Sequence, residues 1–149
     1  MKPVVLAAAA SAFLAISQPA SAQFAKPEDA VKYRKAALTV MGTHFSRLSG
    51  MAQGKIPFDA KAAADNAGVV EATHKLPWAG FTADTQGIES RAKAEIWSNP
   101  AKFQEAQTRL ITEVPQLVIA ARGGKLDDLK AAVANVGSAC KNCHDSFRQ

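Results

Sequence analysis

The sequence predicts an all-α fold, an antiparallel up-down-up-down bundle of four helices formed by one domain, residues 23–149. Three observations lead to this prediction. Apolar residues recur at steps of three and four in four separate segments, which is the period of an amphipathic helix. No stretch alternates apolar and polar residues in the way a half-buried strand does. Short connections join the first pair and the last pair of segments, which favours antiparallel neighbours.

Residues 1–22 have the pattern of a cleaved secretory leader. Lys2 supplies a positive charge, an apolar run covers residues 4–16, and small residues at 20–22 form an A-x-A cleavage site. The apolar run is shorter than the ~20 residues that span a bilayer. We expect cleavage before Gln23 and a soluble chain exported to the periplasm, with no attachment to the membrane.

The first predicted helix covers about residues 27–48. Pro27 suits the first helical position, where a missing N–H costs nothing. The two acidic residues that follow favour the positive end of the helix dipole. Gly50 and Gly54 are expected to end the helix. Its apolar face consists of Val31, Leu38, Met41, Phe45 and Leu48.

The second predicted helix runs from Asp59, its N-cap, to about Leu76, and Pro77 stops it. Its apolar stripe is weak because most of its positions are alanine. Residues 77–98 then form a long connection that contains two tryptophans and a phenylalanine. A connection of this length in a compact domain is usually functional or disordered. Because aromatic residues argue against disorder, we expect this segment to be ordered and to pack over another part of the protein or a bound group.

The third predicted helix opens with Asn99 as its N-cap and Pro100 as its first residue. Pro115 lies inside it and should kink it. Glycines 123–124 are a stop signal, and the fourth predicted helix begins near Lys125. Its apolar face continues without a break and includes both cysteines of the chain: Leu126, Leu129, Val133, Val136, Cys140, Cys143 and Phe147.

The charge balance argues against a nucleic-acid-binding protein. The chain has 18 basic and 13 acidic residues, and removal of the leader takes away one lysine and leaves a formal charge of +4. The lysines are scattered over the predicted helices and form no basic stripe with interleaved aromatic residues. His44 and His74 have no second ligand at a useful spacing, and we expect both to lie on the solvated surface.

Residues 140–144, Cys-Lys-Asn-Cys-His, form the C-x-x-C-H pattern of covalent c-type haem attachment. Side chains three residues apart on a helix lie about 5–6 Å from each other on one face. Cys140 and Cys143 can therefore reach the two vinyl groups of one porphyrin edge. His144 lies on the same face and can coordinate iron through a neutral nitrogen. The sequence thus predicts one covalent haem c with His144 as the metal ligand.

Three other interpretations of the two cysteines stay open. A thioredoxin-like redox motif needs a βαβ context, which the sequence does not predict. A structural zinc site needs four ligands, and only three are present here. A simple disulfide is typical of exported chains. The haem interpretation is favoured because it accounts for both cysteines and for the adjacent histidine.

Beyond the motif, the chain resembles the cytochrome c′ family, the class II c-type cytochromes, over its predicted mature length. Most small c-type cytochromes carry the motif near the N-terminus, whereas here it lies on the last predicted helix. The resemblance implies the same four-helix bundle, a homodimer that packs through its first and second helices, and a role in electron transport. The matching segments are residues 23–34, 76–81, 94–98 and 136–148.

The resemblance also implies how the haem is surrounded. His144 would be its only protein ligand, leaving the iron five-coordinate. Leu38 would cover the open face, and Trp78 and Phe81 would line the same pocket, although all three would also serve as core in any bundle. Four basic residues would lie near the propionates unless they are plain surface charges: Arg34, Lys35, Arg91 and Lys93. Arg148 would lie beside the proximal face.

A pocket closed by Leu38 offers no hydrogen-bond donor to dioxygen, so we expect it to favour NO and CO. Gas binding and electron transfer with an unknown periplasmic partner are the two functions that stay open. In a related six-coordinate subgroup a first-helix methionine is the second axial ligand, and Met41 is the candidate here, or else core. Enzymatic reduction of NO or peroxide is a third hypothesis, but no acid or base lies among the expected distal residues.

Overall fold

The structure is a computed structural model that describes residues 23–149, so the predicted leader lies outside the described residues. Its fold is the antiparallel four-helix bundle predicted from the sequence, and residues 23–149 contain no β-strand beyond one isolated bridge. None of the helices in this range combines the length and apolar character needed to cross a bilayer. The bundle helices are α1 (Pro27–Ala52), α2 (Ala60–Thr73), α4 (Pro100–Arg122) and α5 (Leu126–Phe147).

The connection between α2 and α4 contains three short helical elements. These are the 3₁₀ helices η1 (Leu76–Gly80) and η2 (Ala83–Thr85) and the single turn α3 (Glu95–Ser98). The segment therefore has more local structure than the loop expected from the sequence. η1 and η2 both contact α1, whereas α3 contacts α4 and α5.

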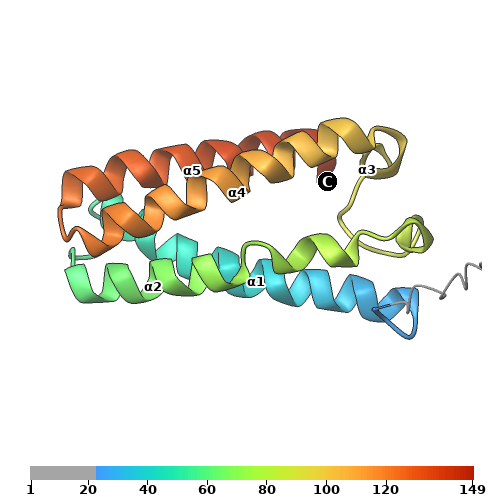
Figure 1. Ribbon diagram of the computed structural model, residues 1–149, viewed down its shortest axis with the longest axis horizontal. Coiled ribbons are helices and arrows are strands. Elements are labelled where there is room, and N and C mark those ends of the chain that lie inside the picture. The colour runs from blue at the N-terminus through green and yellow to red at the C-terminus, as the bar shows by residue number, and fades with distance from the viewer. Residues whose placement is uncertain (1–22) are drawn as a thin grey trace, which may run out of the picture.

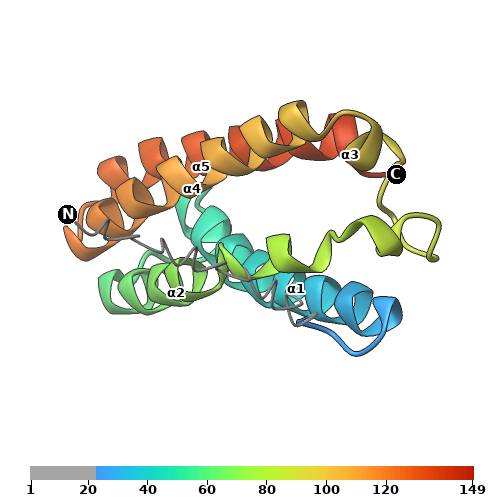
Figure 2. The ribbon, with the colours of Figure 1, turned by 45° about the vertical axis from the view of Figure 1, so that its right-hand side comes forward.

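The four long helices form two layers, with α1 beside α2 in one and α4 beside α5 in the other (Figure 1). The layers lie close together at the end where the α1–α2 and α4–α5 connections are found, and they diverge at the other end (Figure 2). Among neighbouring helices, α1 and α5 have the smallest contact. The first and last bundle helices are therefore the pair that leaves room for a site.

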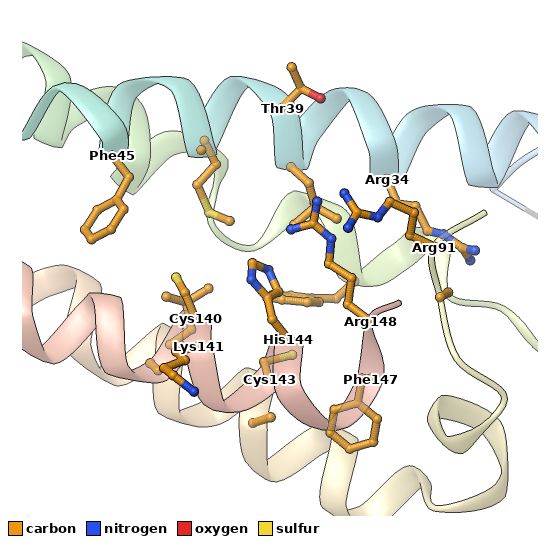
Figure 3. A pocket seen from close by; sticks show the side chains of 18 of the residues that line it. Arg34, Thr39, Phe45, Arg91, Cys140, Lys141, Cys143, His144, Phe147 and Arg148 are labelled. Carbon is orange, nitrogen blue, oxygen red and sulfur yellow. The ribbon is translucent and has the colours of Figure 1, made fainter. Parts of the chain in front are cut away.

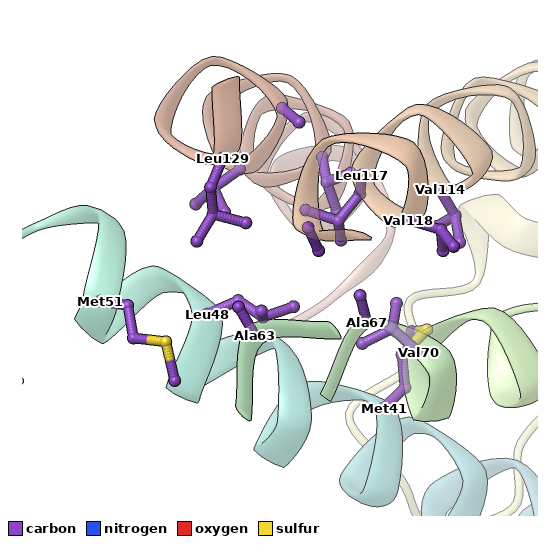
Figure 4. Packing of buried hydrophobic residues seen from close by; sticks show 14 of the residues in the cluster. Met41, Leu48, Met51, Ala63, Ala67, Val70, Val114, Leu117, Val118 and Leu129 are labelled. Carbon is purple, nitrogen blue, oxygen red and sulfur yellow. The ribbon is translucent and has the colours of Figure 1, made fainter. Parts of the chain in front are cut away.

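The main apolar core fills the closed end of the bundle, where side chains of all four helices meet (Figure 4). Leu48, Leu117 and Leu129 are fully buried there. Alanines 63 and 67 give α2 a thin face that lets the opposite layer approach closely. Burial of apolar surface of this kind is the main stabilising contribution in a domain of this size.

The helix ends follow the capping residues of the sequence. The Asp59 side chain accepts a hydrogen bond from the Ala62 amide at 2.8 Å, as expected of an N-cap, and Asn99 opens α4. However, α1 continues beyond its predicted end to Ala52. Gly54 has a φ of 70°, and the Lys55 amide donates to the Gly50 carbonyl, which forms the αL stop of a Schellman motif.

The expected end of the second helix at Pro77 needs adjustment, whereas the predicted kink at Pro115 stays a prediction. α2 ends at Thr73, before Leu76, and the chain enters η1, because Pro77 has no N–H to donate to the Thr73 carbonyl. Pro115 lies on the exposed side of α4, and the helix continues through it to Arg122. It does not divide the third bundle helix into two elements.

The expectation that both early histidines are solvated is wrong. His74 is only 4% exposed, and its Nδ1 donates to the Glu71 carbonyl at 2.6 Å. His44 is half-buried, and its Nδ1 lies 2.8 Å from Asn66 Oδ1, which links α1 to α2. The weak alanine stripe of α2 concealed which of its faces is buried, so the burial of these two side chains could not be deduced from the periodicity.

Candidate functional site

A cavity of about 1200 Å³ lies between α1 and α5, at the end of the bundle where the layers diverge. It is larger than the roughly 300–1,000 Å³ of ordinary small-molecule pockets. In Figure 3, α1 forms its upper wall and α5 its lower wall. Ten of the eleven site residues expected from the sequence line it: Arg34, Lys35, Leu38, Trp78, Phe81, Arg91, Cys140, Cys143, His144 and Arg148.

The two cysteines lie one turn apart on the cavity side of α5, and each is half-buried (Figure 3). Burial raises the pKa of both thiols, and with the neighbouring Cys140 it raises that of Cys143 to about 11. Cysteines that act as thiolate nucleophiles or redox catalysts have a lowered pKa. This pair is therefore unlike a thioredoxin-type active site, and it presents two neutral thiols beside a large cavity.

The imidazole of His144 projects from α5 into the cavity toward α1 (Figure 3). Burial and then the positive charges of Arg148 and Arg91 lower the pKa of His144, while Asp145 acts in the opposite direction. The neutral form, which alone offers a nitrogen lone pair to a metal, is therefore favoured.

The end of α5 is fixed by the segment that precedes α3. The Lys93 amide donates to the Phe147 carbonyl at 3.0 Å, and the Gln149 amide donates to the Arg91 carbonyl at 2.9 Å. The Lys93 ammonium donates to the Asp145 carbonyl at 3.0 Å. Lys93 is thus the one expected site residue that does not line the cavity, because its side chain is directed to the end of α5.

An aromatic cluster forms part of the cavity lining. The rings of Trp78 and Phe81 are stacked with their centroids 6.2 Å apart, and Phe103 packs edge-on against Phe81 at 5.0 Å. Leu38 lines the same cavity from α1. Phe103 and Ile96 also line the cavity; they lie on α4 and α3 and carry no signal in the sequence beyond a core stripe. Phe45 lines it as well, and its spacing of seven residues from Leu38 was a usable signal.

Arg34 is buried, with only 2% of its surface exposed, and it is not the plain surface charge that stayed open above. Its guanidinium donates to the Gly80 carbonyl at 2.8 Å and to Thr85 Oγ1 at 2.9 Å. It also donates to Ser90 Oγ at 3.1 Å. Arg34 therefore attaches the connection between α2 and α3 to α1, while it lines the cavity.

One buried polar atom in the cavity wall requires an acceptor. The Trp78 Nε1 is buried and has no hydrogen-bond partner within residues 23–149. An indole N–H can only donate, so it needs an acceptor that residues 23–149 do not supply. A haem carries two propionates, which are acceptors, beside a large apolar ring. The size of the cavity, its apolar wall, the paired thiols and this donor all fit a haem.

Comparison with known proteins agrees with this fit. The sequence profile of the family described as Cytochrome C' matches residues 29–148, which is most of the chain. The chain belongs to the cytochrome c′ family. Cytochrome c′ of Alcaligenes xylosoxydans xylosoxydans is 45% identical over 127 residues, a match that covers 85% of this chain and 98% of the relative.

Two solved structures of cytochrome c′ show the same fold. The crystal structure from Rubrivivax gelatinosus has a TM-score of 0.82 and 44% identity, and it covers 85% of this chain and 100% of that chain. A nitric oxide complex of a leucine-to-isoleucine variant of cytochrome c prime from Alcaligenes xylosoxidans has a TM-score of 0.79 and 43% identity. That match covers 85% of this chain and 99% of the other.

Membership of the cytochrome c′ family confirms the predicted cofactor, which is one covalent haem c. The chain has only two cysteines, and both belong to the C-x-x-C-H motif in the cavity wall. The roles of the other lining residues toward the haem remain predictions.

Proposed function

We propose that this protein is a periplasmic haem protein that binds NO and CO on the side of the haem opposite His144 and exchanges electrons with a redox partner. The observation on which this proposal rests is the make-up of the cavity: one imidazole projects into it from the α5 wall, and Leu38, Met41 and Phe45 are the apolar side chains that α1 contributes to its lining. Bound haem supplies a redox-active iron that can take a diatomic ligand.

On the α5 wall, Cys140 and Cys143 would hold the haem covalently, and His144 would be its metal ligand. The lowered pKa of His144 keeps its ring neutral, as this role requires. Arg148 lies beside His144 and would place a positive charge on the proximal face. These residues position the haem and set the charge of its surroundings.

On the opposite wall, Leu38, Trp78 and Phe81 would exclude water and leave room for a small ligand. None of these three side chains ionises near neutral pH, so this wall offers no acid or base for proton transfer. Trp78 Nε1 is the only donor among them, and we assign it to a haem propionate. Apolar gases such as NO and CO need no donor, which is why the proposal favours them over dioxygen.

An absorption spectrum of the purified ferrous and ferric holoprotein tests the proposal. Five-coordinate high-spin iron that takes up NO and CO is the expected result. A second axial ligand from the protein would give a low-spin spectrum and slow or absent gas binding, which would overturn it. Met41 is the side chain to replace in that case, because it lies in the core cluster and also lines the cavity.

The cellular location and the assembly belong to the same proposal. The leader pattern of residues 1–22 supports export to the periplasm. We also propose a homodimer that packs through α1 and α2. Support comes from Val40, which is 43% exposed on α1, and from the alanine-rich α2, which permits close approach. Light scattering of the purified holoprotein measures the mass, and a monomer at micromolar concentration would contradict the dimer.

A further inference from the structure

Basic residues gather among the side chains that line the haem cavity. Of the 17 Lys and Arg residues in positions 23–149, six line the cavity, together with only one of the 13 carboxylates, that of Asp145. The remaining 11 basic and 12 acidic residues nearly cancel. The six basic residues, here called the cationic rim, are Arg34, Lys35, Arg47, Arg91, Lys141 and Arg148.

This concentration could not be seen in the sequence, where the basic residues looked scattered. The fold collects them from three places: α1, the segment before α3, and the last turns of α5. Five of the six are exposed, and only Arg34 is buried. The single acid, Asp145, already accepts a hydrogen bond from the Lys141 ammonium. The two propionates of a bound haem would add two negative charges and would leave the rim clearly positive.

We propose that the cationic rim is a docking surface for the acidic face of an electron-transfer protein, which exchanges one electron with the haem through the cavity mouth. This inference rests on the proposed function, because it takes the haem to be redox-active in this cavity. In each event the reduced partner loses one electron, the ferric iron gains it, and no atom is transferred.

A protein partner fits this surface better than a nucleic acid or a bilayer. The six residues of the rim come from three segments around one cavity and form no stripe along a helix, and five of them are exposed where a partner could approach the haem. Charge that is focused on one site raises association rates by about 10–10³-fold and makes them depend on ionic strength. Faster association with an acidic partner leads to faster electron transfer only if the redox centre of the partner also faces the rim.

Reduction of the ferric holoprotein by an acidic flavodoxin, followed by stopped flow, tests the proposal. The test variant is Arg47→Glu/Lys141→Glu on the rim. The matched control is Lys55→Glu/Lys125→Glu, which makes the same change in net charge at the closed end of the bundle. Lys125 lies about 24 Å along α5 from Lys141. The reduction potential of each variant is measured so that rates are compared at equal driving force.

At an ionic strength of about 0.01 M, where the Debye length is roughly 30 Å, we expect the rim variant to react at least about tenfold more slowly than the parent protein. The control should stay within about twofold of the parent, and the difference should vanish near 1 M salt, where the Debye length is about 3 Å. Equal losses in both variants would show that only net charge matters, and unchanged rates would show no docking at the rim. Either result overturns the proposal.

Cosedimentation with anionic phospholipid vesicles is the second measurement. Binding that requires the rim, together with flavodoxin rates that do not, would assign the surface to a membrane and overturn the proposal. Failure of the proposed function looks different. If the haem absorbance of the holoprotein did not change on chemical reduction, or did not change on addition of CO, the haem would not be redox-active or would not be open to ligands. That result would contradict the proposed function independently of the charge variants.

Discussion

The guanidinium carbon of Arg34 lies 4.4 Å from the centroid of the Phe81 ring, so a buried cation on α1 rests on an aromatic residue of the cavity wall. The same guanidinium donates to the Gly80 carbonyl and to Thr85 Oγ1. Arg34 thus joins the bundle to the segment that supplies the aromatic wall. The geometry depends on the planar fork of an arginine, since one ammonium cannot reach these acceptors and also lie over the ring.

Arg34→Lys should therefore lower the free energy of unfolding of the holoprotein by about 2–4 kcal/mol, because buried acceptors lose their charged donor. Denaturation by guanidinium chloride, followed by circular dichroism, measures the change. Arg109→Lys is the matched control, since Arg109 is exposed and makes one long hydrogen bond to Ser138, and it should change stability by less than about 0.5 kcal/mol. A loss below 1 kcal/mol at Arg34 would refute its structural role.

Gly80→Ala and Gly68→Ala should have opposite effects. A Cβ at Gly80 would lie 2.6 Å from the Ala30 carbonyl oxygen and 2.8 Å from Arg34 Cβ, so η1 would have to move away from α1. We expect a loss of about 1–3 kcal/mol. Gly68 lies inside α2 with nothing within 4 Å of such a Cβ, and alanine there should gain about 0.5–1 kcal/mol. Thermal unfolding of both variants checks the signs, and equal signs would contradict the close approach of η1.

Leu38→Ala should accelerate CO binding. If Leu38 covers the open side of the haem, its removal should raise the association rate at least about tenfold, or ~1.4 kcal/mol in activation free energy. Flash photolysis of the ferrous CO complex measures this rate. Val40→Ala makes a similar truncation on the exposed side of α1 and should leave the rate unchanged. An unchanged rate in Leu38→Ala would remove Leu38 from the distal position.

Trp78→Phe keeps an aromatic ring and removes only the indole donor. If Nε1 donates to a propionate, the holoprotein should lose about 1–2 kcal/mol of unfolding free energy, whereas deletion of an unsatisfied buried donor would stabilise it. Trp97→Phe is the reference, because Trp97 Nε1 donates to the Thr82 carbonyl at 3.0 Å. The CO dissociation rate should stay the same in Trp78→Phe. A faster dissociation would instead place this donor beside the bound gas.

The acid stability of haem ligation should depend on Arg148. Burial and the charges of Arg148 and Arg91 lower the pKa of His144 below its usual 6.5. A histidine whose pKa is lowered by folding stabilises the fold fully at pH values above its ordinary pKa. This contribution is lost as the pH falls through the lowered pKa. Arg148→Gln removes one repelling charge, so the pH at which His144 ligation is lost should rise. Soret absorbance during acid titration follows this midpoint. Lys125→Gln should leave it unchanged, and no upward shift in Arg148→Gln would contradict the coupling.

The fold could be predicted because local signals and the global arrangement agree. The apolar periodicity, the N-caps Asp59 and Asn99 and the helix-initiating prolines all lie in the sequence itself, and each is found where expected. The end of α1 was misplaced because the sequence does not show which of Gly50 and Gly54 adopts a positive φ. That choice depends on the hydrogen bonds of the following loop.

The site was predictable to the extent that its chemistry is local. Cys140, Cys143 and His144 form one contiguous motif, and the resemblance to a family supplied most of the opposite wall. The Lys93 side chain does not line the cavity, because its direction depends on pairing between the segment before α3 and the last residues of α5. Phe103 and the cationic rim were missed for a similar reason. Both depend on contacts between residues far apart in the chain, which no periodicity encodes.

The position of the cavity between α1 and α5 has a consequence for folding. Its two walls carry Leu38 and Cys140, about a hundred residues apart, so closing them requires one of the longest loops in the domain. Contacts of such high sequence separation slow folding. A haem attached covalently to one wall and packed against the other would bridge that separation, so its binding would help to hold the cavity end of the domain together.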